Sequence, residues 1–139
     1  MRAVDSNVLV RLVARDDARH VAAAESFVSR GAWVSHLVLT EATWVLTSVY
    51  DLRAKELATT IDMILKHQDL TLQDADVVEA ALAQFRKKPA LSFSDCLILE
   101  TARKAGHLPL GTLDRNFAKH EGVELIKADG GLADPPSRD

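Results

Sequence analysis

Short apolar segments alternate with longer amphipathic stretches along this chain, and this alternation predicts strands and helices in turn. The strand candidates are short, apolar and closed by polar or turn residues: 2–4, 33–35, 69–72, 108–112 and 123–127. The helix candidates carry apolar side chains three or four positions apart: 7–14, 17–29, 36–50, 54–66, 75–86, 94–105 and 115–120. Strands that alternate with helices favour parallel pairing, because each return to the sheet passes through a helix.

The predicted fold class is therefore α/β. We expect a three-layer α/β/α sandwich with a central, mostly parallel sheet of four to five strands. Residues 1–128 form one predicted domain, and residues 129–139, which hold two glycines and two prolines, form a predicted flexible C-terminal tail.

Composition agrees with one folded domain of ordinary type. The chain has 139 residues, of which 47% are hydrophobic and 27% charged. Cys96 is the only cysteine, so an internal disulfide is impossible and a reducing compartment is expected. The N-terminus is too broken by polar residues for a signal peptide, and no apolar run is long enough to span a bilayer. We expect a cytoplasmic protein with no membrane partner.

Four carboxylates fall where this scheme brings the chain to one edge of the sheet. Asp5 and Asp114 follow strand candidates, while Glu41 and Asp95 lie in the first turns of helices. Functional sites of parallel α/β sheets lie outside the carboxyl ends of the strands, so we expect all four side chains to meet there.

Such a cluster implies a cation, because neighbouring carboxylates repel and raise one another's pKa values. Oxygen ligands without a Cys/His pattern favour Mg²⁺ or Mn²⁺. An ion of this kind can activate water and stabilise the leaving oxygen in phosphodiester hydrolysis.

Each acid also has a purely structural interpretation. Asp5 is placed to cap a helix, Asp95 to favour a helix dipole, and Asp114 to open a turn. Glu41 lies in an apolar stretch, where a charge is paired, coordinating or solvated on the opposite face.

Taken together, the segments around these acids resemble the PIN-domain family, and specifically VapC-type toxins of bacterial toxin–antitoxin pairs. The four motifs are Val4-Asp5-Ser6-Asn7-Val8-Leu9, Leu39-Thr40-Glu41, Phe93-Ser94-Asp95-Cys96-Leu97-Ile98 and Gly111-Thr112-Leu113-Asp114-Arg115-Asn116-Phe117. Their order and spacing match from Val4 to about Ile126.

The resemblance implies a Mg²⁺- or Mn²⁺-dependent endoribonuclease, a homodimer, an RNA substrate and a cognate VapB-type antitoxin as partner. It makes Asp5, Glu41, Asp95 and Asp114 the catalytic and metal-binding quartet. The same resemblance gives supporting roles to four polar residues: Ser6, Asn7, Thr112 and Asn116. Asn116 stands where some relatives have a further acid, which favours a single metal ion.

RNA contact is expected from basic residues near the site, namely Arg11, Arg15 and Arg115. The net charge of −3 gives no basic footprint for the chain as a whole. Trp33 and Trp44 lie in apolar contexts and are expected in the core or an interface.

Three other functions remain open at this stage. The chain could be a PIN-domain nuclease of RNA processing rather than a toxin that inhibits translation and growth. It could be a non-catalytic regulatory binding module. A phosphatase with an aspartyl nucleophile also begins from an Asp at a strand end, but that chemistry usually has a second acid two positions later, where this chain has Asn7.

Overall fold

The computed structural model describes residues 1–127, so the predicted tail at 129–139 lies outside the described residues. The elements in chain order are β1 (Arg2–Ala3), α1 (Ser6–Ala14), α2 (Ala18–Val28), β2 (Ala32–Val34), α3 (His36–Ser48), α4 (Ala54–Lys66), β3 (Leu70–Leu72), α5 (Ala75–Lys87), α6 (Phe93–Ala105), β4 (Leu110–Thr112), the 3-10 helix η1 (Phe117–Lys119) and β5 (Val123–Leu125). Over the part of the chain described, no helix is both long and apolar enough to cross a membrane.

The helix boundaries follow from local capping. Asp17 accepts hydrogen bonds from the backbone N–H groups of Arg19 and His20 at the start of α2, and Ser92 accepts one from Asp95 at the start of α6. Gly106 ends α6 with a φ of 83°, a left-handed conformation that glycine adopts without strain. All predicted helices and strands are present, with ends shifted by a few residues.

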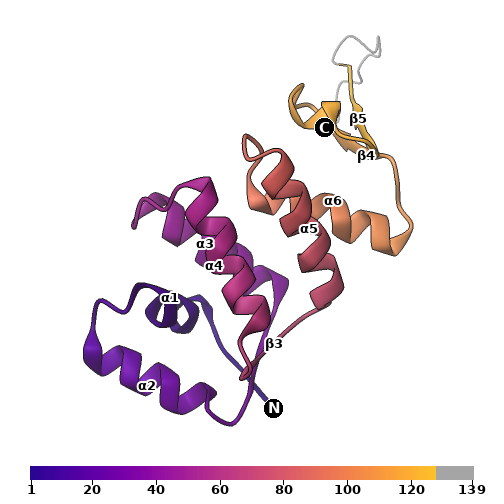
Figure 1. The fold of residues 1–139 in the computed structure, drawn as a ribbon. Helices are drawn as coiled ribbons and strands as arrows, with labels where there is room; N and C mark the ends of the chain where they lie inside the picture. The colour runs from indigo at the N-terminus through magenta and orange to yellow at the C-terminus, as the bar shows by residue number, and fades with distance from the viewer. Residues whose placement is uncertain (128–139) are drawn as a thin grey trace, which may run out of the picture.

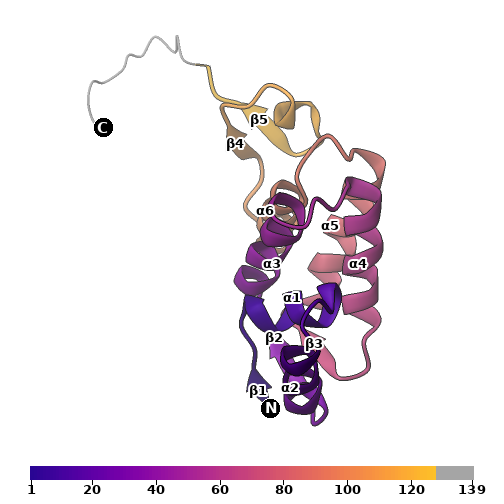
Figure 2. The same cartoon turned by 90° about the vertical axis from the view of Figure 1, so that its left-hand side faces the viewer.

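Two parallel sheets carry the five strands. Strand β2 pairs with β1 on one side and β3 on the other, with Trp33 opposite both Ala3 and Thr71. Strands β4 and β5 pair with each other, with Gly111 opposite Glu124. In both views these two strands lie at the end of the molecule farthest from β1 (Figures 1 and 2).

The α/β class and the parallel strands are confirmed, but the expected single sheet of four to five strands is divided three and two within this chain. The reason lies in helix packing. Helix α6 packs mainly along α5, and the chain leaves its C-terminal end toward β4, away from the three-stranded sheet (Figure 1).

The core extends through all of the helices and reaches β4 and β5. Its largest fully buried side chains come from all six α-helices and from β2: Leu9, Val28, Val34, Leu39, Leu46, Ile61, Val78, Phe93, Cys96 and Leu99. On the three-stranded sheet, one face is buried through Val4, Val34 and Leu72. The other face is open, because Ala3, Trp33 and Thr71 are exposed in a row.

The two tryptophans lie at the surface. The side chain of Trp44 is 66% exposed and that of Trp33 is 37% exposed. The expectation that they belong to the core is wrong, and an interface role for them stays a prediction.

Three contacts hold β4 and β5 against the rest of the fold. Phe117, between them, is 6% exposed and belongs to the main core. Arg103 on α6 pairs with the buried Glu100 at 3.2 Å and donates a hydrogen bond to the carbonyl of Glu121 at 3.3 Å. Leu110 of β4 and Val123 of β5 are partly buried against the same core. The β4–β5 pair therefore has a fixed place beside α6.

Phe117→Ala tests that placement. We expect the variant to lose about 3 kcal/mol of unfolding free energy, because truncation leaves a cavity in a shared core. Met63→Ala on α4, where the side chain is 65% exposed, is the control and should change stability by less than about 0.5 kcal/mol. Urea denaturation at one protein concentration measures both. Equal stabilities for the two variants would show that β4 and β5 are not part of the main core.

Candidate functional site

Asp5 lies where β1 ends and α1 begins. One carboxylate oxygen accepts a hydrogen bond from the N–H of Val8 at 3.3 Å, so this side chain caps α1. The side chain is exposed. A carboxylate has two oxygens, and capping uses only one of them here, so Asp5 can both fix the helix start and ligate an ion.

Glu41 and Asp95 differ from Asp5 in having no protein partner. Glu41 is exposed on the second turn of α3, and Asp95 is half-buried in the first turn of α6. Among residues 1–127, neither carboxylate accepts a hydrogen bond or forms an ion pair at contact distance. Asp95 is favoured by the dipole of α6, and neither carboxylate has a protein partner there that would compete with a ligand.

Asp114 organises the turn after β4. It accepts hydrogen bonds from the N–H groups of Asn116 at 2.8 Å and Phe117 at 3.4 Å, and its own N–H donates to the hydroxyl of Thr112 at 3.0 Å. Thr112 contacts Asp114 through its hydroxyl and Asn116 through its backbone N–H, and a supporting role for the two residues stays a prediction. Ser6 and Asn7, the other two, occupy the first turn of α1 beside Asp5.

Within this single chain the quartet is not assembled. Over residues 1–127, no three side chains of His, Cys, Asp or Glu lie close enough to hold a metal ion together. Asp5 follows a strand of the three-stranded sheet, whereas Asp114 follows a strand of the separate pair at the other end of the molecule (Figure 2). The predicted convergence at one sheet edge therefore fails within one copy, because the sheet that would produce it is divided.

An open groove of about 380 Å³ lies between the elements that carry Glu41 and Asp95. Its walls come from α3, α4 and the segment 89–94, and they are largely apolar with Thr and Ser hydroxyls among them: Thr40, Thr43, Thr47, Ser92 and Ser94. Thr40 and Ser94 directly precede Glu41 and Asp95 in sequence. Neither acid itself lines the groove.

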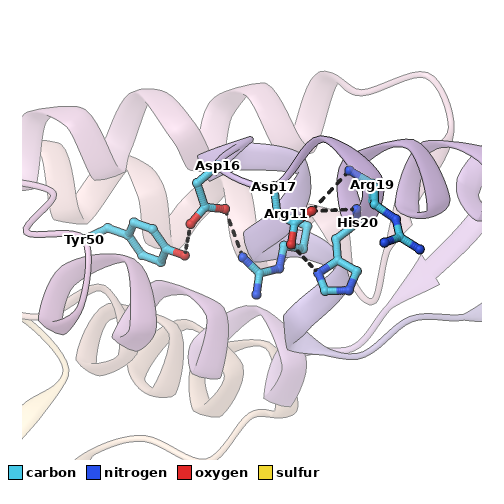
Figure 3. Close-up of polar contacts among 6 residues, drawn as sticks. All are labelled: Arg11, Asp16, Asp17, Arg19, His20 and Tyr50. Carbon is cyan, nitrogen blue, oxygen red and sulfur yellow. Dashed lines mark hydrogen bonds and ion pairs between the residues drawn. The ribbon is translucent and has the colours of Figure 1, made fainter.

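A polar network that the sequence did not predict joins α1 to the end of α3 (Figure 3). Asp16 pairs with Arg11 at 2.9 Å and accepts a hydrogen bond from the Tyr50 hydroxyl at 2.9 Å. The hydrogen bond from Tyr50 lowers the pKa of Asp16, and the backbone N–H of Asp16 and Arg11 lower it further, whereas the carboxylate raises the pKa of Tyr50.

These contacts bear on the residues expected to meet RNA. Arg11 is engaged with Asp16, and Arg15 pairs with Glu25 at 3.0 Å. Both pairs are partly exposed, so the cost of exchanging their carboxylates for a phosphate is small. Arg115 is exposed beside Asp114. RNA contact by all three stays a prediction.

Cys96, next to Asp95, is not a candidate ligand. Its side chain is buried, and burial, together with the nearby negative charges of Asp95 and Glu100, raises the pKa of the thiol to about 11. A thiol that stays protonated is a poor metal ligand, so the site has oxygen donors only.

Comparison with known proteins adds one finding to this geometry. No curated protein and no solved structure matches the chain. A family model does match, that of the PIN domain, and it covers residues 2–123. The matched region contains Asp5, Glu41, Asp95 and Asp114, and it runs from β1 through β4 to the first residue of β5. The chain belongs to the PIN domain family.

Proposed function

We propose that this protein is a metal-dependent endoribonuclease that cleaves RNA phosphodiester bonds, with Asp5, Glu41, Asp95 and Asp114 as its catalytic and metal-binding residues. The observation that carries the proposal is the family match over residues 2–123. PIN domains are typically nucleases, and they usually bind Mg²⁺ or Mn²⁺.

The donor set suits such an ion. All four side chains offer carboxylate oxygen, which Mg²⁺ and Mn²⁺ prefer, and Glu41 and Asp95 have no competing partner among residues 1–127. A divalent ion held there supplies Lewis acidity toward a phosphate oxygen and toward water. The protein residues fix the geometry and handle the proton.

The four acids form two pairs with different roles in this mechanism. Asp5 and Asp114 are held by backbone N–H groups, so their ligating oxygens are oriented before substrate arrives. Glu41 and Asp95 are free to accept a proton from water or to orient it. The groove between α3 and the segment 89–94 gives the RNA strand a place beside these two side chains.

The biological role we propose is that of the toxin in a VapBC-type toxin–antitoxin pair, with a VapB-type antitoxin as partner, a cytoplasmic location and a homodimeric state. The resemblance of the four motifs to VapC-type toxins supports this finer assignment. A PIN nuclease of RNA processing is the second candidate, favoured by the same site chemistry. A non-catalytic binding module would leave Glu41 and Asp95 without a purpose.

Asp5→Asn separates catalysis from helix capping. Asparagine caps helices as well as aspartate does, so we expect the variant to keep its stability. RNA cleavage should nevertheless fall by at least about 100-fold, because an amide is a poor substitute for a charged metal ligand. Cleavage of a labelled RNA and calorimetric titration with Mn²⁺ measure the two losses.

Asp17→Asn is the matched control, since Asp17 caps α2 in the same way. It should cleave RNA and bind Mn²⁺ like the unchanged protein. Full cleavage by folded Asp5→Asn, or absence of Mn²⁺ binding by the unchanged protein, would contradict the proposed mechanism, and the latter result would favour the binding module.

The toxin role is tested in cells. Induced expression of the unchanged chain in a bacterial host should arrest growth and fragment RNA, whereas Asp5→Asn should do neither, because growth arrest depends on cleavage. Cleavage of purified RNA without any growth arrest would point to the RNA-processing nuclease instead.

A further inference from the structure

Within residues 1–127, β1 and β4 each have an open edge, and we propose that these two edges pair between copies. Strand β4 of one copy docks on the free edge of β1 in a second copy, and the reverse contact forms at the same time. The resulting strand-exchanged dimer has two five-stranded sheets. The dimer rests on backbone geometry alone, whereas its role in completing the acidic site rests on the proposed function.

The free edge of β1 can be assigned to a residue. The N–H of Val4 donates to the carbonyl of Trp33 at 3.1 Å, so Val4 faces β2. Successive residues of a parallel strand direct their backbone groups to opposite sides. The N–H and C=O of Ala3 therefore point away from β2, and over residues 1–127 β1 pairs with no other strand.

The free edge of β4 follows from the same reasoning. The N–H of Leu110 donates to the carbonyl of Gly122 at 2.8 Å, and the carbonyl of Thr112 accepts from the N–H of Ile126 at 2.7 Å. Both residues thus face β5. Gly111 between them directs its backbone groups outward, and in the described part of the chain β5 is the sole partner of β4. Exposed strand edges of this kind are templates for another strand.

Apolar side chains accompany both edges. Beside β1 and β2, Met1 is 78% exposed and Trp33 lies on the open face of the sheet. Around β4 and β5, Leu108, Leu113 and Ile126 are exposed. Parallel sheets are normally covered on both faces, and a two-stranded sheet by itself is only marginally stable. The β1 edge lacks a neighbouring strand, which β4 of a second copy can provide. The β4–β5 pair lacks a further strand, which β1 of that copy can provide.

A second copy fits these edges better than the chain's own β4. The β4–β5 pair is held beside α6 by buried Phe117 and by the contact of Arg103 with Glu121. To reach β1 of the same chain, which lies at the other end of the molecule, it would have to give up those contacts (Figures 1 and 2). Pairing between copies preserves the contacts of Phe117 and Arg103. A two-fold axis pairs both β1 edges with both β4 edges at once.

Exchange would also complete the site. In a parallel pair the residues that follow each strand meet at the same edge, so Asp114 of one copy comes to Asp5 of the other. Arg115, exposed beside Asp114, comes to the same edge, where its positive charge offsets the added carboxylate of Asp114. The dimer thereby accounts for the separation of Asp114 from Asp5 within one chain, where they follow strands of different sheets.

A mixture of two inactive variants tests the shared site. Asp5→Asn and Asp114→Asn are unfolded in urea, mixed in equal amounts and refolded together. Half of the dimers are then mixed, and each has one intact site of two, so activity should recover to about 25% of that of the unchanged protein. If the mixture stays as inactive as each variant alone while the unchanged protein cleaves RNA, the sites lie within single chains and the proposal is overturned.

Ala3→Pro tests the edge without any reference to activity. Proline removes only the N–H that points away from β2, a change that a true edge strand tolerates. We expect the unchanged protein to have twice the 15.2 kDa chain mass by light scattering, and Ala3→Pro to be a folded monomer. Ala3→Val keeps the N–H and should stay dimeric.

A monomeric unchanged protein, or a folded Ala3→Pro variant as dimeric as Ala3→Val, overturns strand exchange. A dimer that dissociates on Ala3→Pro but never cleaves RNA leaves strand exchange standing and removes the proposed function. The mass measurement and the cleavage assay thus separate the two failures.

Discussion

Backbone pairing at the outer edge of β1 is the constraint on which the proposed acidic site depends. Strand β1 brings Asp5 to the end of the three-stranded sheet, but it is paired on one side only. Pairing of β4 on the other side of β1 determines whether Asp114 lies beside Asp5. Helix packing and the core are complete without that contact, whereas the acidic site is not.

Local structure and chemistry use the same carboxylates. Asp5 starts α1 and Asp114 shapes the turn before η1, so both side chains are positioned by backbone N–H groups of their own segments. This explains why a structural and a functional interpretation of each acid fit the sequence equally well. Glu41 is the exception, because it lies beyond the first turn of α3, where neither capping nor the helix dipole explains its carboxylate.

The sequence predicted local features well and long-range pairing poorly. Apolar spacing located all of the helices and strands, since periodicity and caps such as Ser92 act over a few residues. Nothing in that spacing states which strands are neighbours, so the division between β3 and β4 was missed. The contact of Asp16 with Tyr50 joins residues far apart in sequence and was hidden for the same reason. Trp44 was misplaced because an apolar neighbourhood in sequence is not burial in space.

Amide hydrogen exchange at Ala3 and Gly111 tests the central claim most directly, because these two residues direct their N–H groups toward the open edges. NMR can follow both amides at high protein concentration and after dilution. The account predicts slow exchange at both positions in concentrated protein and fast exchange at both after dilution, while core amides such as that of Val34 stay protected throughout. Fast exchange at Ala3 and Gly111 at every concentration would contradict it.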